Sequence, residues 1–243
     1  MRGGVFIWLA VAACGAAAPV DFRLPHPDAG SGPIRVRGYA FDDRTESIRL
    51  VDEGSLDHPR FGGIDRAMQA AGAVAGCNGG FFAPDAVPLG LMVADGVATG
   101  RLAGGVLTGG VLFRDDRCLL LLRVNEFRSR PRPRIAQLVQ AGPLLVDAGR
   151  TVAGLDDSKP RCRTILVHDQ VHTWAIGVTG EVTLRDLGAA LAAAGQAGGV
   201  RAVRALNLDG GSSSCLWVRG APGGPVLRNA WKPVRNYLAI VPK

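Results

Sequence analysis

Short apolar runs, separated by residues that favour turns, dominate the pattern of hydrophobic and polar positions along this chain. Apolar runs of this length, bounded by Gly, Pro, Asn or Asp, are typical of β-strands. The runs that we predict to be strands are 34–41, 47–51, 73–77, 89–93, 111–113, 118–124, 162–168, 171–178, 202–208, 215–218 and 237–241. Turn residues such as Asp95-Gly96 join several neighbouring runs and predict β-hairpins.

Two segments carry the spacing of an amphipathic helix instead. Residues 61–71 place apolar side chains on one face, and Gly72 follows at the position where helices commonly end. Thr183 is a typical N-cap with Asp186 three residues later, which predicts a helix that ends at Gly195. Because strands outnumber helices, the sequence predicts an α+β fold, with a mixed, largely antiparallel sheet and a few packed helices.

The composition indicates a single globular domain. The 243 residues are 47% hydrophobic and 20% charged, which is enough to bury a substantial core. No repeat of fixed period and no long low-complexity linker divides the chain. We therefore predict one domain over residues 34–243, preceded by a Pro/Gly-rich segment at 25–33.

Residues 1–18 have the pattern of a targeting segment. Arg2 precedes an apolar stretch at 5–13 that is too short to span a bilayer as a helix, which is typical of a secretion signal. Residues 11–14 (VAAC) resemble the signal of bacterial lipoproteins, in which the Cys is lipidated, and cleavage after 16–18 is the alternative. The sequence thus predicts an exported protein, either periplasmic or attached to the membrane through a lipidated Cys14.

The charge balance indicates an anionic partner. A formal net charge of +7 and a pI near 9.7 attract phosphorylated glycans, lipid headgroups or nucleic acids. Part of this charge lies in RSRPRPR at 128–134, whose alternating prolines favour an extended, solvated loop. No aromatic platform or known recognition motif accompanies these arginines, so we predict no nucleic-acid partner. The sequence leaves the oligomeric state open.

Four cysteines follow Cys14, at positions 77, 118, 162 and 215. An even number in an exported chain allows two disulfides, and buried free thiols are an equally good alternative. If the two motifs described next lie against each other, Cys77 with Cys215 and Cys118 with Cys162 are the natural pairs.

Two polar corners, each at the end of an apolar strand, are the most distinctive features of the sequence. The first is NGGFF at 78–82 and the second is NLDGGSSS at 207–214. In each, paired glycines accept positive φ angles and let backbone N–H groups converge on an anion such as phosphate. Tight turns that bond their own backbone are the alternative for either corner alone. Asp209 adds a carboxylate whose surroundings can tune its pKa.

Other kinds of site fit these motifs less well. The glycines lack the Lys-Ser/Thr end of a P-loop and the helix of a dinucleotide fingerprint, so we predict no cofactor. No G-x-S-x-G elbow surrounds the serines, and Cys77 or Cys215 is a poor nucleophile beside an expected disulfide. No His, Cys or carboxylate cluster has metal-ligand spacing, and a hard cation held by Asp209 and carbonyl oxygens stays an open alternative.

The motifs resemble those of the phosphodiester glycosidases, the family of the enzyme that uncovers mannose 6-phosphate by removing N-acetylglucosamine from a sugar-phosphate diester. The matching segments occur in the family's order between Val36 and Ile240: NGGFF, PLGLMVADG at 88–96, QAGPLLVDAG at 140–149, CRT at 162–164 and NLDGGSSS. One departure is the run of serines followed by Cys215, where many relatives have glycine or proline among the serines.

The resemblance implies hydrolysis of the bond between a sugar anomeric carbon and phosphate. It places four residues in the catalytic site: Asn78, Arg163, Asn207 and Asp209. Phosphate leaves as a stabilised anion, so a cation such as Arg163 matters more than a strong general acid. Asp209 could be the nucleophile, the base or a stabiliser of the oxocarbenium ion.

Residues of the same motifs are expected to contact the substrate. They are Gly79, Gly80, Phe82, Gln140, Thr164, Gly210, Gly211, Ser212 and Ser213. Residues 101–110 or 222–233 are candidate specificity loops. The alternative function is a non-catalytic protein that binds phosphate or anionic glycans through the same glycines and Arg163.

Overall fold

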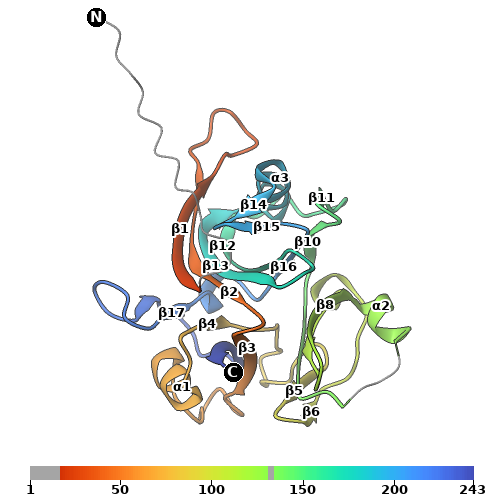
Figure 1. The fold of residues 1–243 in the computed structure, drawn as a ribbon, viewed down its shortest axis with the longest axis vertical. Helices are drawn as coiled ribbons and strands as arrows, with labels where there is room; N and C mark the ends of the chain where they lie inside the picture. The colour runs from red at the N-terminus through yellow and green to blue at the C-terminus, as the bar shows by residue number, and fades with distance from the viewer. Residues whose placement is uncertain (1–16, 131–133) are drawn as a thin grey trace, which may run out of the picture.

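The structure, a computed structural model, describes residues 17–130 and 134–243 (Figure 1). These residues form one seven-stranded sheet, two five-stranded sheets and a small β-hairpin, with three α-helices on their surfaces. Within the described ranges, no helix is long and apolar enough to cross a membrane. Almost all of the predicted targeting segment, including Cys14, lies outside the described residues.

The seven-stranded sheet carries helix α3 (Leu184–Ala194) on one face (Figure 1). Its strand order is β1-β2-β13-β12-β16-β10-β11. The strands are β1 (Ala18–Leu24), β2 (Ile34–Asp42), β10 (Leu144–Asp147), β11 (Arg150–Thr151), β12 (Arg161–His168), β13 (Thr173–Val182) and β16 (Arg204–Asn207). The predicted ends of α3 are confirmed, because Thr183 Oγ1 accepts from Asp186 N at 3.1 Å and Gly195 adopts the left-handed conformation. The hairpin β14 (Gln196–Ala197) and β15 (Val200–Arg201) follows α3.

The second sheet has the order β18-β17-β4-β19-β3 and packs against helix α1 (Ile64–Ala71). Its strands are β3 (Glu46–Asp52), β4 (Ala75–Asn78), β17 (Leu216–Val218), β18 (Val226–Arg228) and β19 (Asn236–Pro242). Helix α1 buries Ile64, Ala67 and Met68, as its spacing predicts, and ends at Gly72. The 3₁₀ turn η2 (Gly211–Ser213) leads from β16 into β17.

The third sheet has the order β6-β5-β9-β7-β8, in which the hairpins β5–β6 and β7–β8 pair with the two sides of the central strand β9. Its strands are β5 (Met92–Ala94), β6 (Val97–Thr99), β7 (Gly110–Arg114), β8 (Leu119–Arg123) and β9 (Gln137–Ala141). The turn predicted at Asp95-Gly96 is confirmed, since both residues have positive φ, 49° and 82°. The 3₁₀ turn η1 (Val106–Thr108) precedes β7, and the short helix α2 (Val124–Arg128) follows β8.

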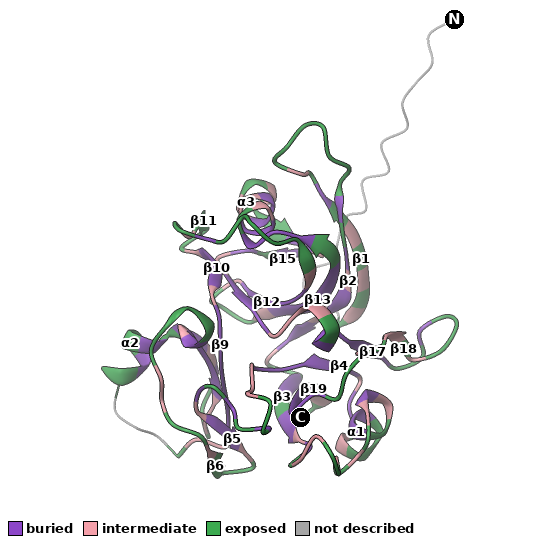
Figure 2. Cartoon of the chain, turned by 180° about the vertical axis from the view of Figure 1, so that it is seen from behind, coloured by how far each residue is buried: buried purple, intermediate pink, exposed green. Residues whose placement is uncertain are grey.

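One apolar core joins the three sheets. The largest buried cluster draws residues from each of them, including Phe41, Leu50, Leu112, Leu206 and Leu238. Figure 2 shows the strands largely buried and the connecting loops exposed. All strand pairs of the described residues are antiparallel, so the sheets are not mixed. Strands also far outnumber the three α-helices of the described residues, so the fold is more sheet-dominated than the predicted α+β class.

Several segments differ from what the sequence pattern suggests, and strands β9 and β10 lie outside every predicted run. Strand β1 precedes the predicted domain start at 34 and pairs with β2 along its whole length, from Ala18 opposite Ala40 to Leu24 opposite Ile34. It is an edge strand, since it is the first in the order of the sheet, and its alternating burial leaves the odd side chains exposed. In the predicted solvated loop at 128–134, Arg128 is instead the last residue of α2, and residues 131–133 lie outside the described part.

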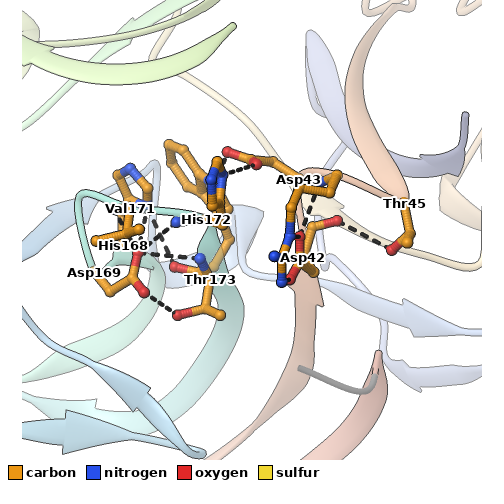
Figure 3. A network of polar contacts seen from close by, with 10 residues as sticks. Asp42, Asp43, Thr45, His168, Asp169, Val171, His172 and Thr173 are labelled. Carbon is orange, nitrogen blue, oxygen red and sulfur yellow. Dashed lines mark hydrogen bonds and ion pairs between the residues drawn. The ribbon is translucent and has the colours of Figure 1, made fainter. Parts of the chain in front are cut away.

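A polar network ties the β12–β13 hairpin to the turn between β2 and β3 (Figure 3). Asp43 accepts from Trp174 Nε1 at 3.0 Å and pairs with His172 Nδ1 at 2.8 Å. His168 lies beneath, stacked on Trp174 with ring centroids 3.4 Å apart, and its Nδ1 donates to the Thr173 carbonyl at 3.2 Å. The imidazole of His168 is therefore held as a neutral, buried ring.

This burial makes stability fall at mildly acidic pH. It lowers the pKa of His168 from 6.5 to about 4. The unfolded chain binds a proton at His168 more readily than the folded protein does. Stability is therefore lost as the pH falls from 6.5 to about 4, by on the order of 3 kcal/mol at the lower end of this window. Urea denaturation across the window should show this slope, and His168→Gln should flatten it. An unchanged slope in the variant would contradict the assignment.

Candidate functional site

The two polar corners lie against each other at one end of their sheets. Asn78 ends β4, and Asp209 follows β16 after Leu208. Asn78 Nδ2 donates to the Asp209 carbonyl at 2.6 Å, and Asp209 N donates to the Gly79 carbonyl at 3.0 Å. Segments that are separated by 131 positions in the sequence thus form one structural unit.

The side chain of Asn78 connects the parts of this unit through hydrogen bonds. Its Oδ1 accepts from Thr164 Oγ1 at 2.8 Å and from Cys215 N at 3.0 Å. The side chain is 1% exposed, and both ends of its carboxamide bond to protein groups. Asn78 and Thr164 therefore fix the positions of neighbouring groups and do not line the pocket described below.

The glycine pairs of the two corners have different surroundings. A Cβ on Gly79 would lie 2.0 Å from Asn236 Oδ1, and one on Gly80 would lie 2.6 Å from the Gln140 carbonyl. These two glycines are buried, and they permit close packing of strands. Gly211 has a φ of 61° with open space around its Cβ position, and it faces the pocket together with Gly210.

A pocket of about 550 Å³ opens beside the second corner. Its lining combines the predicted residues of that corner with a group of basic and aromatic side chains. The lining residues are Phe81, Arg161, Cys162, Arg163, Glu181, Asn207, Asp209, Gly210, Gly211, Ser212, Arg228, Trp231 and Lys232. A cavity of this size with convergent polar groups is the usual form of a small-molecule site.

Asp209 is the half-buried carboxylate of the pocket. Burial raises its pKa above the ordinary value of 3.8, while hydrogen bonds from Ser213 and from Gly210 N oppose this shift. The bond from Gly210 N to Asp209 Oδ1 is 2.8 Å long. Asp209 is therefore a carboxylate with strengthened basicity in a fixed orientation.

Asn207 lines the pocket and carries a buried acceptor without a partner in the described ranges. Its Nδ2 donates to the Gly142 carbonyl at 2.9 Å, which fixes the orientation of the amide. The side chain is 2% exposed, and its Oδ1 has no hydrogen-bond partner among the described residues. A buried carbonyl oxygen without a donor is unfavourable, so a ligand hydroxyl would satisfy it.

Arg163 reaches the pocket with part of its guanidinium already bonded. Its Nε donates to the Val182 carbonyl at 3.0 Å and its Nη2 to the Lys159 carbonyl at 2.8 Å. In residues 17–130 and 134–243, Nη1 has no such bond, so it is the group available to an anion. Burial lowers the pKa of Arg163 below its ordinary value, a direction that an anionic ligand would reverse.

Several lining residues were not predicted from the sequence. Arg228, Trp231 and Lys232 were not singled out, although all three lie within the candidate specificity loop at 222–233, whereas the other candidate, 101–110, does not contribute to the lining. Arg161 and Glu181 line the pocket from the same end of the β12–β13 hairpin, where Arg161 lies opposite Val182 and Cys162 lies opposite Glu181. Arg161 directly precedes the CRT motif at 162–164, which is a sequence signal that could have found it, whereas no local signal marks Glu181.

Gln140 and Phe82 are, like Gly79, Gly80 and Thr164, predicted contact residues that do not line the pocket. The Gln140 carboxamide bonds the backbone of Leu91, Ala103 and Thr108 and organises the loop before β7. Phe82 packs on the core beside α1, and Phe81 lines the pocket in its place. Ser213 is buried and donates to Asp209, whereas Ser212 is exposed at the pocket.

The four cysteines of the described residues are free. Cys77 pairs opposite Leu216, so Cys215, one residue earlier, points to the other face of the sheet. The two thiols accordingly belong to different apolar clusters, and the expected pairing of Cys77 with Cys215 is wrong. Cys118 and Cys162 are likewise unpaired, on separate sheets. No group of three or more His, Cys, Asp or Glu side chains in the described ranges is placed to hold a metal.

Modification of the Cys162 thiol should block the pocket. Its Sγ lies in the lining and accepts from Arg228 Nη2 at 2.8 Å, so an added group displaces that guanidinium. Cys77 and Cys215 are buried, and burial raises the pKa of both thiols, that of Cys215 to about 12. In a Cys118→Ser background, iodoacetamide should abolish phosphate binding, measured by calorimetry, with the adduct mapped to Cys162 by mass spectrometry.

The matched control is the same background with Cys162→Ser. It should keep phosphate binding after the same treatment. If the protein alkylated at Cys162 still binds phosphate normally, the thiol does not face the ligand.

The fold and the pocket together define a class: an antiparallel β-sheet protein with a carboxylate, an unpaired amide oxygen and several cations around one cavity. The family model for phosphodiester glycosidases matches residues 71–241 of this chain. The chain therefore belongs to the phosphodiester glycosidase family. No curated protein matches it.

Solved structures share the fold at low sequence identity. One is the catalytic domain of the zebrafish N-acetylglucosamine-1-phosphodiester alpha-N-acetylglucosaminidase, auto-inhibited by its pro-peptide, with a TM-score of 0.67 and 17% identity over 96% of this chain and 85% of that chain. Another is a hypothetical protein from Synechocystis, with a TM-score of 0.60 and 16% identity over 94% of this chain and 62% of that chain. Family and fold indicate a glycosidase of phosphodiesters through a distant relationship.

Proposed function

We propose that this protein hydrolyses the bond between the anomeric carbon of a sugar and the phosphate of a sugar-1-phosphodiester. One observation carries the proposal: the basic carboxylate of Asp209, the unpaired Oδ1 of Asn207 and the cations around them share one cavity. A sugar offers hydroxyl donors and a phosphodiester offers anionic oxygens, and the cavity has a complement for each. Export of the protein is part of the proposal and rests on the pattern of residues 1–18.

The reaction depends more on stabilising the negative charge of the leaving phosphate than on a strong general acid. When the C1–O bond breaks, its electron pair stays on the phosphate oxygen, and charge grows there in the transition state. Arg161, Arg163 and Lys232 line the cavity and would stabilise that charge. The oxocarbenium-like sugar that remains is electron-poor and lies near the Asp209 carboxylate.

Water completes the reaction at the anomeric carbon. Its oxygen forms the new bond to C1, and one of its protons passes to the Asp209 carboxylate and then to solvent. The products are a free reducing sugar and a phosphomonoester. The raised pKa of Asp209 suits it to accept this proton near neutral pH.

Hydrolysis of synthetic sugar-1-phosphate methyl diesters tests the proposal. Purified protein should release reducing sugar, and in ¹⁸O-labelled water the label should appear at C1 of the sugar. Label in the phosphate would assign attack at phosphorus instead. Tight binding of the diesters without any release would identify a non-catalytic binding protein.

Arg163→Ala should slow hydrolysis most for diesters whose phosphate leaves poorly, because those develop the most charge. We expect a loss in kcat of about 100-fold for the poorest leaving groups and a smaller loss for activated aryl phosphates. The measurement is kcat against the pKa of the leaving phosphate. Arg185→Ala is the control, since Arg185 is exposed and pairs with Asp157 on the surface. Equal losses across the series would remove Arg163 from leaving-group stabilisation.

A further inference from the structure

Trp231 is the most exposed large apolar side chain of the described residues, at 85%. An indole in this position leaves its apolar faces in water, where the ring of a ligand can stack on them. Its backbone is fixed, because Trp231 N donates to the Ser212 carbonyl of the second corner at 2.8 Å. The ring is therefore presented from a defined point at the edge of the proposed catalytic pocket.

Trp231 and Lys232 also line a second cavity, of about 240 Å³. The two residues belong to the linings of both cavities, so the cavities are neighbours that meet at these residues. Pockets for drug-sized ligands usually occupy about 300–1,000 Å³, and the second cavity is smaller. Its size suits a single ring.

The second cavity differs from the first in its charge. Among the described residues, Lys232 is the only basic side chain in its lining. The carboxylate in the lining, Glu53, is buried and accepts from Phe61 N at 2.7 Å and from Gly63 N at 3.3 Å. The cavity therefore lacks the cluster of cations that a second phosphate would need.

The rest of the lining combines apolar and hydrogen-bonding surface. Pro59, Val234 and the indole of Trp231 give apolar contacts, and the exposed Asn229 gives an amide. A pyranose ring has the same combination, with C–H groups on its faces and hydroxyls at its edge. Aromatic faces favour such polarised C–H groups.

We propose that the second cavity binds a further, uncharged sugar ring of the same substrate, with Trp231 as the platform between the two cavities. This rests on the proposed function and extends it: the substrate is an oligomeric phosphoglycan and not a simple diester. Trp231 then determines specificity for chain length and takes no part in bond cleavage.

Binding to the inactive Asp209→Asn protein tests this independently of turnover. The probes are one sugar-1-phosphate methyl diester and two analogues with neutral saccharide extensions, one on each side of the phosphate. All three carry the same charge, so any difference in affinity comes from the added rings. We expect one extended analogue to bind about tenfold more tightly than the methyl diester.

Variants of Trp231 test whether this residue causes the difference in affinity between the probes. In the same background, Trp231→Ala should remove the preference for the extended analogue, and Trp231→Phe should keep most of it. Val171→Ala is the matched control, because it removes another exposed apolar side chain, 62% exposed, on the β12–β13 hairpin. It should keep the full preference.

Three results would overturn the inference. They are equal affinity for all three probes, a preference that survives Trp231→Ala, and loss of binding to anionic lipid vesicles in Trp231→Ala with saccharide binding unchanged, which would make Trp231 a membrane contact. Each leaves the proposed function standing if the wild-type protein still releases sugar from the methyl diester. A wild-type protein that prefers the extended analogue but releases no sugar would keep the second subsite and refute the enzyme.

Discussion

Asp209→Asn is expected to abolish turnover and, at the same time, to stabilise the folded protein at neutral pH. Loss of the proton acceptor should lower kcat by about 10³-fold. The gain in stability, on the order of 1 kcal/mol, is typical when a functional site loses an unfavourable buried charge. Assays of sugar release and urea denaturation of the same samples measure both effects.

The sign of the stability change follows from the pKa of Asp209. Burial raises it above 3.8, so the native state holds this proton at pH values where the unfolded chain has released it. Stability therefore falls as the pH rises through that interval and stays lower above it. Asn is neutral at every pH, so the variant should be more stable than the wild type at neutral pH, with the difference vanishing below the ordinary Asp pKa.

The exposed Asp116 provides the control. Asp116→Asn should change neither turnover nor stability appreciably. An Asp209→Asn enzyme with normal turnover would remove this carboxylate from the chemistry. A variant that is less stable at neutral pH would mean that the hydrogen bonds from Gly210 and Ser213 outweigh the burial of the charge.

Asn78→Ala is expected to have the largest effect on stability. It removes the partner of the Asp209 carbonyl, of Thr164 Oγ1 and of Cys215 N. The substitution leaves three polar groups at the joint of the two corners without a protein partner, and it should destabilise the protein by about 3 kcal/mol or more. Activity should fall as well, since the backbone that carries Asp209 loses its anchor. Chemical denaturation and kcat, both measured well below the unfolding transition, separate the two effects.

Thr164→Val is the milder counterpart of this variant. It keeps the size of the side chain and removes one of the three hydrogen bonds, so the expected loss of stability is about 1 kcal/mol. The fold of both variants can be checked by circular dichroism. If Asn78→Ala is as stable and active as the wild type, the contact between the corners does not position Asp209.

Local signals in the sequence predicted most of the elements correctly. The N-cap at Thr183, the left-handed end at Gly72 and the Asp95-Gly96 turn each depend on interactions within a few residues, and all are present. Strand β1 escaped prediction because its apolar positions are few and its partner, β2, supplies the pairing. The prediction of largely antiparallel pairing is confirmed, but the expected mixed sheet was wrong, since the direction of each pairing depends on connections that local patterns do not encode.

The disulfide expectation shows the limit of reasoning from proximity in sequence. Cys77 and Cys215 flank corners that do meet, but alternate side chains of a strand point to opposite faces, and the register puts Leu216 opposite Cys77. Register is a property of the assembled sheet. Phe81 reaches the pocket while Phe82 packs on the core, a division that the NGGFF motif by itself does not encode.

The sequence by itself determined the hairpins, the helix ends, the family resemblance and the chemical types at the two corners, because these depend on neighbouring residues or on contiguous motifs. Only the tertiary structure decided which of those residues face the ligand. Sheet pairing buried Asn78, Gly79 and Thr164, which position the neighbouring backbone and do not contact the pocket. Strand β18 and its connection to β19 brought Arg228, Trp231 and Lys232, which lie in a candidate loop but in no motif, to the wall of the pocket.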